Sequence, residues 1–364
     1  MRVDRRQVLA FRLCRHGLSG DGDDALLDYG VQDTGSDGSA WALAVRGSAA
    51  REDDGLLAWT LRGAPHRYRR PDAAAVALAT SPWSEADAAK RIFDASTPLR
   101  AAGLPVLEAL ATVAATMRSI VTRPMVKGEV SARLTAELPK PFLRRCVPCD
   151  AIHTYEQPFR LAALQAGLAL EPGTSPPVLR RLKGVKPLAF GRSGADADAR
   201  FDVVRNHLRF FGPIDPKSVA AYVDAPVKDV KAHWPEDVVE VEVDGRTGSV
   251  LAEDVALLDD PGGLPKGVTL LAPFDPYLQL RDRELLVPDA AARKDLWRTL
   301  GRPGGLLVDG EVRGSWRART KGTKVELTVT PWATLTKVSR KRAEDAGEEL
   351  AAHRGLTSAG VRWA

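Results

Sequence analysis

Three consecutive polar residues, Gln32, Asp33 and Thr34, carry side chains that could hold and activate a water molecule. A glutamine amide oxygen can orient a water and face a developing cation without being ionised. A threonine hydroxyl can hold the same water, and an aspartate is the best general base of the three. Consecutive residues on a helix point about 100° apart, so only an irregular turn would bring these groups together. The glycine-containing run that follows, residues 35–38, permits such a turn.

The same triplet has a structural interpretation. Asp33 or Thr34 would cap the following helix by accepting its first amide hydrogens, and Gln32 would be a surface residue. The geometry at residues 32–34 distinguishes the two interpretations.

A second group, Cys146, Cys149 and His153, has the spacing of metal ligands. Structural zinc takes four ligands, and the nearest fourth candidate is Glu156, because no second cysteine pair exists. The alternative, which we favour, is that both cysteines are buried apolar residues and the histidine packs or caps. We therefore expect no metal and no other cofactor.

Basic residues gather on two predicted hairpins. The hairpin near the C-terminus would lift its cations from the surface, where they could reach DNA phosphates or enter a minor groove. Its residues are Arg317, Arg319, Lys321 and Lys324. The other hairpin carries Arg62 and His66, again placed for phosphate contact. A solvated charged hairpin is the alternative in both cases, and a net charge of +5 supports a polyanionic partner only where the charge clusters.

Carboxylates and guanidinium groups also alternate in residues 274–277 and 281–283. Buried ion pairs and turns produce this pattern as often as active sites do, so we assign it no catalytic role. The sequence contains no phosphate-binding glycine loop, no cue for a Ser–His–Asp arrangement and no nicotinamide fingerprint.

The elements that must position these residues are short helices followed by hairpins. Helices are predicted at residues 4–16, 25–31 and 39–46, and strands at 56–61 and 66–68, which is the outline of a winged helix. The outline recurs with helices at 107–121, 127–138 and 149–168 before a strand pair, and again with helices from 201 to 233 before a hairpin at 238–251.

The last hundred residues read differently. Strands are predicted at 268–272, 284–287, 305–308, 312–319 and 324–329, with helices at 290–300 and 338–353. The predicted fold class is therefore α+β, with tandem winged-helix units at 1–100, 101–192 and 193–262 and a mixed α/β part at 263–364.

Composition limits the setting. A chain of 364 residues predicts two or three domains, and its 44% hydrophobic residues can form real cores. No apolar run approaches the roughly 20 residues of a membrane span, and no signal peptide opens the sequence. Three cysteines fit a reducing compartment. We expect a cytoplasmic protein without membrane contact, and a monomer.

Several stretches together resemble a bacterial family of winged-helix DNA-binding proteins, some of whose members are DNA glycosylases for alkylated and crosslinked purines. They are residues 30–34 with 40–46, 61–66, 145–153, 170–176, 271–278 with 281–283, and 308–317. The resemblance implies a catalytic motif of glutamine, an apolar residue, then glutamine or aspartate, which aligns with Gln32, Asp33 and Thr34. The first position matches and the other two differ. It also implies that the C-terminal hairpin touches DNA.

Two functions follow as hypotheses, both with double-stranded DNA as the partner. The first is a glycosylase that excises bulky or crosslinked N-alkylpurines, with Gln32 positioning water assisted by Asp33 or Thr34. A bulky lesion need not enter a tight pocket, so full base flipping would not be required. The alternative is a non-catalytic DNA-binding protein, such as a regulator or an architectural factor; a protein-interaction scaffold ranks third.

Overall fold

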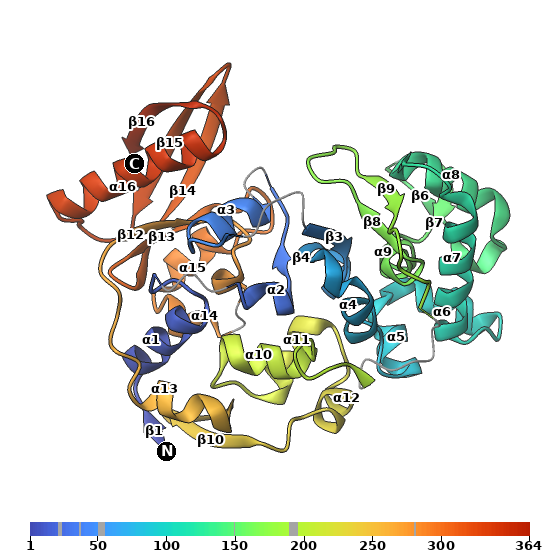
Figure 1. Cartoon of the computed structure of the whole chain (residues 1–364), viewed down its shortest axis with the longest axis horizontal. Coiled ribbons are helices and arrows are strands. Elements are labelled where there is room, and N and C mark those ends of the chain that lie inside the picture. The colour runs from blue at the N-terminus through green and yellow to red at the C-terminus, as the bar shows by residue number, and fades with distance from the viewer. Residues whose placement is uncertain (21–23, 36–37, 50–54, 149, 189–195, 280–281) are drawn as a thin grey trace.

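Four β-sheets and the helices between them form two lobes in the computed structural model (Figure 1). The structure describes residues 1–364 apart from 21–23, 36–37, 50–54, 149, 189–195 and 280–281. The chain is thus mixed α+β, as predicted. In the described residues no single helix has the length and apolar composition of a membrane span; one bent pair, Phe93–Ala101 with Val106–Ile120, meets those two criteria.

The largest sheet joins strands from the first two predicted units. Its order is β2 (Val31–Gln32), β4 (Pro65–Arg69), β3 (Gly55–Trp59), β8 (Leu168–Leu170), β9 (Val178–Arg181) and β5 (Met125–Val126). The bridge between the two units is the pair Leu57–Leu170. Four consecutive residues of β3, 56–59, are buried, so this strand needs cover on both faces. The first predicted hairpin is therefore an interior part of this sheet.

The three helices predicted before this hairpin begin within one residue of their predicted starts, whereas the three that follow it, α4 (Ala73–Ala79), α5 (Glu85–Arg91) and α6 (Ser96–Ala101), were not predicted. Asp4 caps α1 (Arg5–Arg15), because its side chain accepts a hydrogen bond from the backbone nitrogen of Gln7. The Gln7 side chain in turn accepts from the backbone nitrogen of Asp4, which completes a capping box. The second helix is shorter than predicted, because Val31 belongs to strand β2 and pairs with β4. The other helices of this region are α2 (Leu26–Tyr29) and α3 (Gly38–Ala44).

The second lobe is built on α7 (Val106–Ile120), α8 (Lys127–Glu137) and α9 (Glu156–Gln165), which share one apolar core. The long helix predicted from Cys149 is wrong. Residues Ala151–Thr154 form β7, which pairs with β6 (Leu143–Cys146), and α9 begins only after it. The β-branched residues Ile152 and Thr154 favour a strand here.

The third predicted unit has three helices and then a hairpin, as expected. They are α10 (Val203–Phe211), α11 (Pro216–Val223), α12 (Val227–Ala232), β10 (Val238–Val243) and β11 (Arg246–Leu251). The free edge of β10 is paired with β1 (Arg2–Val3) from the N-terminus. Val3 and Val8 share a core with Val241 and Val250, so α1 is packed onto the third unit.

The C-terminal part is a five-stranded sheet with α16 (Lys337–His353) packed on it. Its strands are β12 (Val268–Leu271), β13 (Gly304–Val308), β14 (Glu311–Lys321), β15 (Lys324–Pro331) and β16 (Thr357–Trp363), and the helices before it are α13 (Val255–Asp259), α14 (Arg283–Leu286) and α15 (Ala290–Leu296). The strand predicted at residues 284–287 is wrong, because they belong to α14 and the turn after it. The strand β16 was not predicted.

A buried ion pair ties α3 to the C-terminal part. Arg46 donates to both carboxylate oxygens of Asp275 at 2.8 and 2.7 Å, and to the His16 carbonyl oxygen at 2.6 Å. Both side chains of the pair are 0% exposed. The Asp275 carboxylate, next to Phe274, is thus part of a buried ion pair, one of the two interpretations that the sequence left open.

We predict that Arg46→Ala lowers the free energy of unfolding by about 3–5 kcal/mol, because it leaves the Asp275 carboxylate buried and uncompensated. The matched control is Arg133→Ala, which breaks an exposed pair with Glu129 and should change stability by no more than ~1 kcal/mol. Urea unfolding followed by far-ultraviolet circular dichroism measures both. Equal midpoints for the two variants would contradict the assignment.

Candidate active site

Gln32 lies at the end of β2, opposite His66 of β4. It is 8% exposed, so the expectation of a surface residue is wrong. Its amide oxygen accepts a hydrogen bond from Arg62 Nη2 at 3.0 Å, and its amide nitrogen donates to Thr34 Oγ1 at 3.0 Å. The pairing of β2 with β4 continues through Asp33, so the alternation of extended chain, and not the irregular turn that we expected, puts Gln32 and Thr34 on the same side.

Asp33 has the capping role. Its Oδ1 accepts from the backbone nitrogen and from the hydroxyl of Ser39, both at 2.8 Å, at the start of α3. Its own amide donates to the Pro65 carbonyl at 2.8 Å, which extends the pairing of β2 with β4 by one residue. The carboxylate therefore stabilises the start of helix α3. Thr34, which is half-buried, contacts Gln32.

Arg62 occupies the turn between β3 and β4. Its backbone is left-handed, with φ 58°, a conformation that residues other than glycine rarely adopt. Its guanidinium lies 4.1 Å from the centre of the Tyr222 ring, and Nη1 donates to the Tyr222 carbonyl oxygen at 3.4 Å. The phosphate contact expected of Arg62 stays a prediction, since in the free protein this guanidinium is turned onto Gln32 and Tyr222.

His66 is 1% exposed, so the sequence-based expectation of a surface contact to DNA is wrong for the free protein. The reason is the burial of its hairpin within the six-stranded sheet. Nδ1 lies 3.0 Å from the Ala64 carbonyl oxygen and 3.0 Å from the Thr60 hydroxyl oxygen. Burial, assisted by the charge of Arg62, lowers the pKa of His66 to about 3. The ring is neutral at physiological pH.

Positive charge also converges on this region from the C-terminal part. The guanidinium of Arg302 lies 5.0 Å from the centre of the Phe274 ring. Burial, followed by the charges of Arg283 and Arg62, lowers the pKa of Arg302 to about 10. Arg302 thus lies within electrostatic reach of Arg62, the residue that bonds to the Gln32 amide. Sequence reasoning missed Arg302, because only the fold brings it near the first unit.

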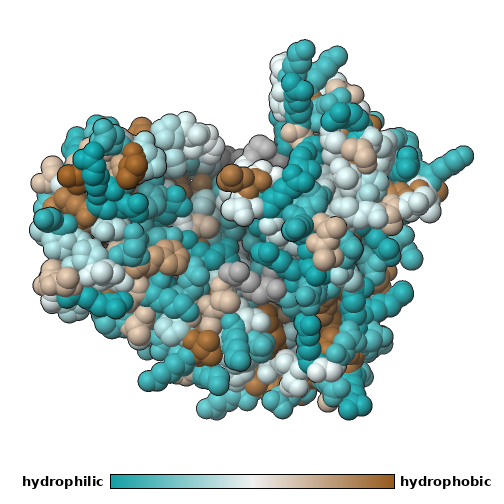
Figure 2. Space-filling model, turned by 180° about the vertical axis from the view of Figure 1, so that it is seen from behind, coloured by the Kyte–Doolittle hydropathy of each residue, from teal (hydrophilic) through white to brown (hydrophobic). Residues whose placement is uncertain are grey.

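The second basic hairpin is present as predicted. Strands β14 and β15 pair from Gly314–Pro331 to Lys321–Lys324 and stand out from the body (Figure 1). The projecting end is covered by hydrophilic side chains, beside a notch between the lobes (Figure 2). Strand alternation puts the predicted cations on one face, while α16 packs on the other. They are Arg317, Arg319, Lys321 and Lys324.

The structure adds Arg362 to this basic face. Its partner across β15 and β16 is Thr328, to which it donates at 3.0 Å. Arg317 is held partly by Asp295 at 3.3 Å, whereas Arg319 and both lysines are exposed. The signal that sequence reasoning missed is the alternation of Val361, Arg362 and Trp363, which is typical of a strand.

The cysteine group has no support as a metal centre in the part of the chain that the structure describes. Cys146 and His153 lie on neighbouring strands of the β6–β7 hairpin, and His153 Nδ1 lies 2.8 Å from the Thr154 carbonyl oxygen. Cys149 lies outside the described residues. Within those residues no group of three or more histidine, cysteine or acidic side chains could hold a metal ion. Freedom from metal stays a prediction.

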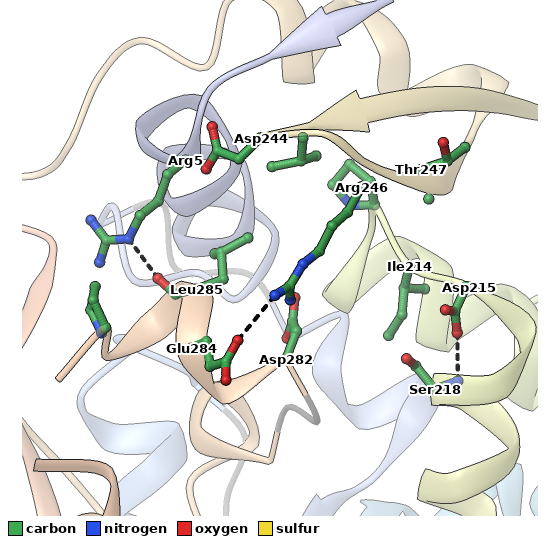
Figure 3. Close-up of a pocket in the computed structure, with 14 residues that line it drawn as sticks. Arg5, Ile214, Asp215, Ser218, Asp244, Arg246, Thr247, Asp282, Glu284 and Leu285 are labelled. Atoms are coloured by element: carbon green, nitrogen blue, oxygen red, sulfur yellow. Dashed lines mark hydrogen bonds and ion pairs between the residues drawn. The ribbon is translucent and has the colours of Figure 1, made fainter. Parts of the chain in front are cut away.

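A separate pocket of about 390 Å³ lies between the third unit and α14 (Figure 3). Its charged residues largely engage one another or the backbone: Arg246 donates to Glu284 at 3.1 Å, and Arg5 to the Leu285 carbonyl at 2.6 Å. Asp282, also in its wall, accepts from the fully buried Arg12 at 2.7 Å. Within the stretch 281–283, Asp282 thus belongs to an ion pair. Arg281 lies outside the described residues.

Comparisons with known proteins identify a family and a similar fold. Residues 43–353 match the family described as DNA glycosylase AlkZ-like. Among solved structures, the chain is similar to the Streptomyces sahachiroi DNA glycosylase AlkZ, with a TM-score of 0.72, 20% identity and coverage of 100% of both chains. At that identity the likeness concerns the fold. A search of curated proteins gave no match. Since the family match spans most of the sequence, the chain belongs to the AlkZ-like DNA glycosylase family.

Proposed function

We propose that this protein hydrolyses the N-glycosidic bond of bulky or crosslinked N-alkylpurines in double-stranded DNA. The observation that carries the proposal is the amide of Gln32, which is held by hydrogen bonds between Arg62 and Thr34. The solved structure that the chain resembles is that of a DNA glycosylase, and the shared fold supports the same class of reaction here.

The chemistry suits these residues. A purine alkylated at N7 or N3 already carries a positive charge, so it leaves without a strong general acid. The enzyme must then stabilise an oxocarbenium-like sugar and deliver a water to C1′. One lone pair of the Gln32 amide oxygen is used by Arg62, and the other remains for such a water. Thr34 is the second group that could hold it.

The shape of the surface would admit a large lesion. The notch lies between the lobes (Figure 2). A bulky or crosslinked base could therefore be attacked without being fully flipped into a pocket. We further propose that the three helix-and-hairpin units are tandem winged helices that embrace the duplex. Location in the cytoplasm and a monomeric state remain predictions.

A non-catalytic DNA-binding function is the second candidate. It is favoured by the 8% exposure of Gln32, which leaves little of the amide within reach of a substrate. The proposed reaction therefore needs the bound duplex to approach the amide closely.

We predict that Gln32→Ala abolishes base release while duplex affinity changes less than about threefold, because the amide contacts the reacting sugar and water rather than the backbone. Release of 7-methylguanine and opening of a nitrogen-mustard crosslink are the assays, with affinity measured by fluorescence anisotropy. Gln7→Ala, a remote glutamine variant in α1, is the control and should retain activity. A wild-type protein that binds alkylated duplexes and releases no base would support the second candidate.

Asp33 and Thr34 should behave differently. Asp33→Asn preserves the cap acceptor and is expected to keep the rate of base release within about threefold, because the carboxylate already accepts two bonds from Ser39. Thr34→Val removes the hydroxyl beside Gln32 and should lower that rate roughly tenfold or more. Single-turnover rates of base release measure both variants, and thermal melting checks that each is folded. Loss of activity in a normally stable Asp33→Asn variant would make Asp33 the general base.

The basic hairpin should contribute salt-dependent affinity. The triple variant Arg319→Ala, Lys321→Ala, Lys324→Ala is expected to reduce the slope of log affinity against log salt by about 3, since each lost phosphate contact removes about 0.9. Lys337→Ala, Lys341→Ala, Arg342→Ala removes equal charge from the outer face of α16 and is the control. Identical slopes for the two triple variants would show that the hairpin makes no special contact.

A further inference from the structure

The amide of Gln32 needs a neighbour that decides which way round it lies. Its oxygen and nitrogen ends have nearly the same shape, so a half-turn of the amide exchanges them at little steric cost. The end that faces Arg62 meets a group that can only donate hydrogen bonds. A reversed amide would place its own N–H groups against that guanidinium, and no hydrogen bond would form. Arg62 therefore admits one orientation only.

We propose that Arg62 is a positioning residue for Gln32, an inference that rests on the proposed function. Its bond at 3.0 Å fixes the amide oxygen, which directs the amide nitrogen to Thr34 Oγ1 at 3.0 Å. Because the Thr34 oxygen accepts this bond, the hydroxyl proton is free to donate outward. Gln32 thus presents an oxygen lone pair, and Thr34 a hydroxyl, in a fixed arrangement before any substrate arrives.

The backbone of Arg62 is anchored by the second lobe. From α9, Gln157 Nε2 donates to the Arg62 carbonyl oxygen at 3.4 Å, and Arg160 Nη1 donates to the carbonyl oxygen of Gly63 at 3.0 Å. These bonds hold a turn in which Arg62 keeps a left-handed φ of 58°. Strained backbone of this kind persists where the surroundings over-determine it, and it clusters at functional sites.

The guanidinium of Arg62 is supported by rings from the first and third units. Tyr222 of α11 lies beneath it at 4.1 Å, and Tyr29 of α2 stacks on Tyr222 with ring centres 6.1 Å apart. The Tyr29 hydroxyl lies 2.7 Å from His207 Nδ1 of α10, and this contact is buried. A planar guanidinium stacks on such a surface, whereas a lysine ammonium does not. All three predicted units therefore converge on this one side chain.

The kinetic test compares Arg62→Ala, Arg62→Lys and the surface control Arg100→Ala in single-turnover base release, with duplex affinity measured separately. We expect Arg62→Ala to lower the rate constant roughly tenfold to a hundredfold, the loss that follows removal of a hydrogen bond from a charged group, with affinity nearly unchanged. Arg62→Lys should recover only part of the rate. Millimolar guanidinium should restore Arg62→Ala, relative to equal sodium chloride, and should not restore Gln32→Ala.

Two results would overturn the proposal. One is a wild-type rate in Arg62→Ala. The other is a loss that appears entirely as weaker DNA binding, with no rescue by guanidinium, which would make Arg62 a phosphate contact.

A second readout does not depend on activity. The chain has five glutamines, so side-chain ¹⁵N labelling of glutamine gives few amide signals, and Gln32→Ala assigns the one of interest. Arg62→Ala should shift the Gln32 amide signals and leave those of Gln7, Gln165 and Gln279 in place, whereas Gln157 donates to the Arg62 carbonyl oxygen and is not used as a reference. If the Gln32 signals do not move, Arg62 does not hold the amide, whatever the activity. If they move but wild-type protein releases no base, the proposed function fails while the contact between Arg62 and Gln32 stands.

Discussion

The hydrogen bond from Arg62 to the Gln32 amide oxygen is the point where the parts of the chain meet. Gln32 and Arg62 come from β2 and from the turn that precedes β4, the second lobe holds the backbone of that turn, and the third unit supplies Tyr222 beneath the guanidinium. A displacement of any of these parts would change the direction of the amide. The fold can thus be understood as a frame that keeps one neutral polar group in a fixed orientation.

Such a frame suits a reaction in which the leaving group is already charged. The protein does not need a strong acid, and the structure does not offer Asp33 as one, because its carboxylate caps α3. The neutral His66, with its lowered pKa, adds no charge of its own. What remains is a polar amide and a hydroxyl beside the guanidinium of Arg62. Positive potential attracts DNA, whereas the neutral amide can face the cationic sugar.

The sequence predicted the local elements better than their assembly. Apolar spacing located α1, α7, α8 and α16 within a few residues, because one face of each helix is buried. The first hairpin was also found, yet its residues were placed on the surface. Four consecutive buried positions in β3 depend on the pairing of Leu57 with Leu170, over a hundred residues away, and no local pattern encodes that pairing.

The site was predicted in part for the same reason. Gln32 and Thr34 could be selected by residue type, and the capping of α3 by Asp33 follows from local rules. The contact between Arg62 and Gln32 could not be predicted from the sequence. It requires a residue with left-handed backbone in a turn that is held by α9. Arg362 was missed because β16 is a parallel strand whose partner lies beyond a whole helix.

The measurement that tests the account most directly is a structure of the protein bound to a duplex that carries a non-hydrolysable analogue of a bulky N7-alkylguanine nucleotide. The account predicts the anomeric carbon of the lesion within reach of a single water held by the Gln32 amide oxygen, with the β14–β15 hairpin against the backbone. A duplex bound elsewhere, with Gln32 still covered and remote from the lesion, would contradict it.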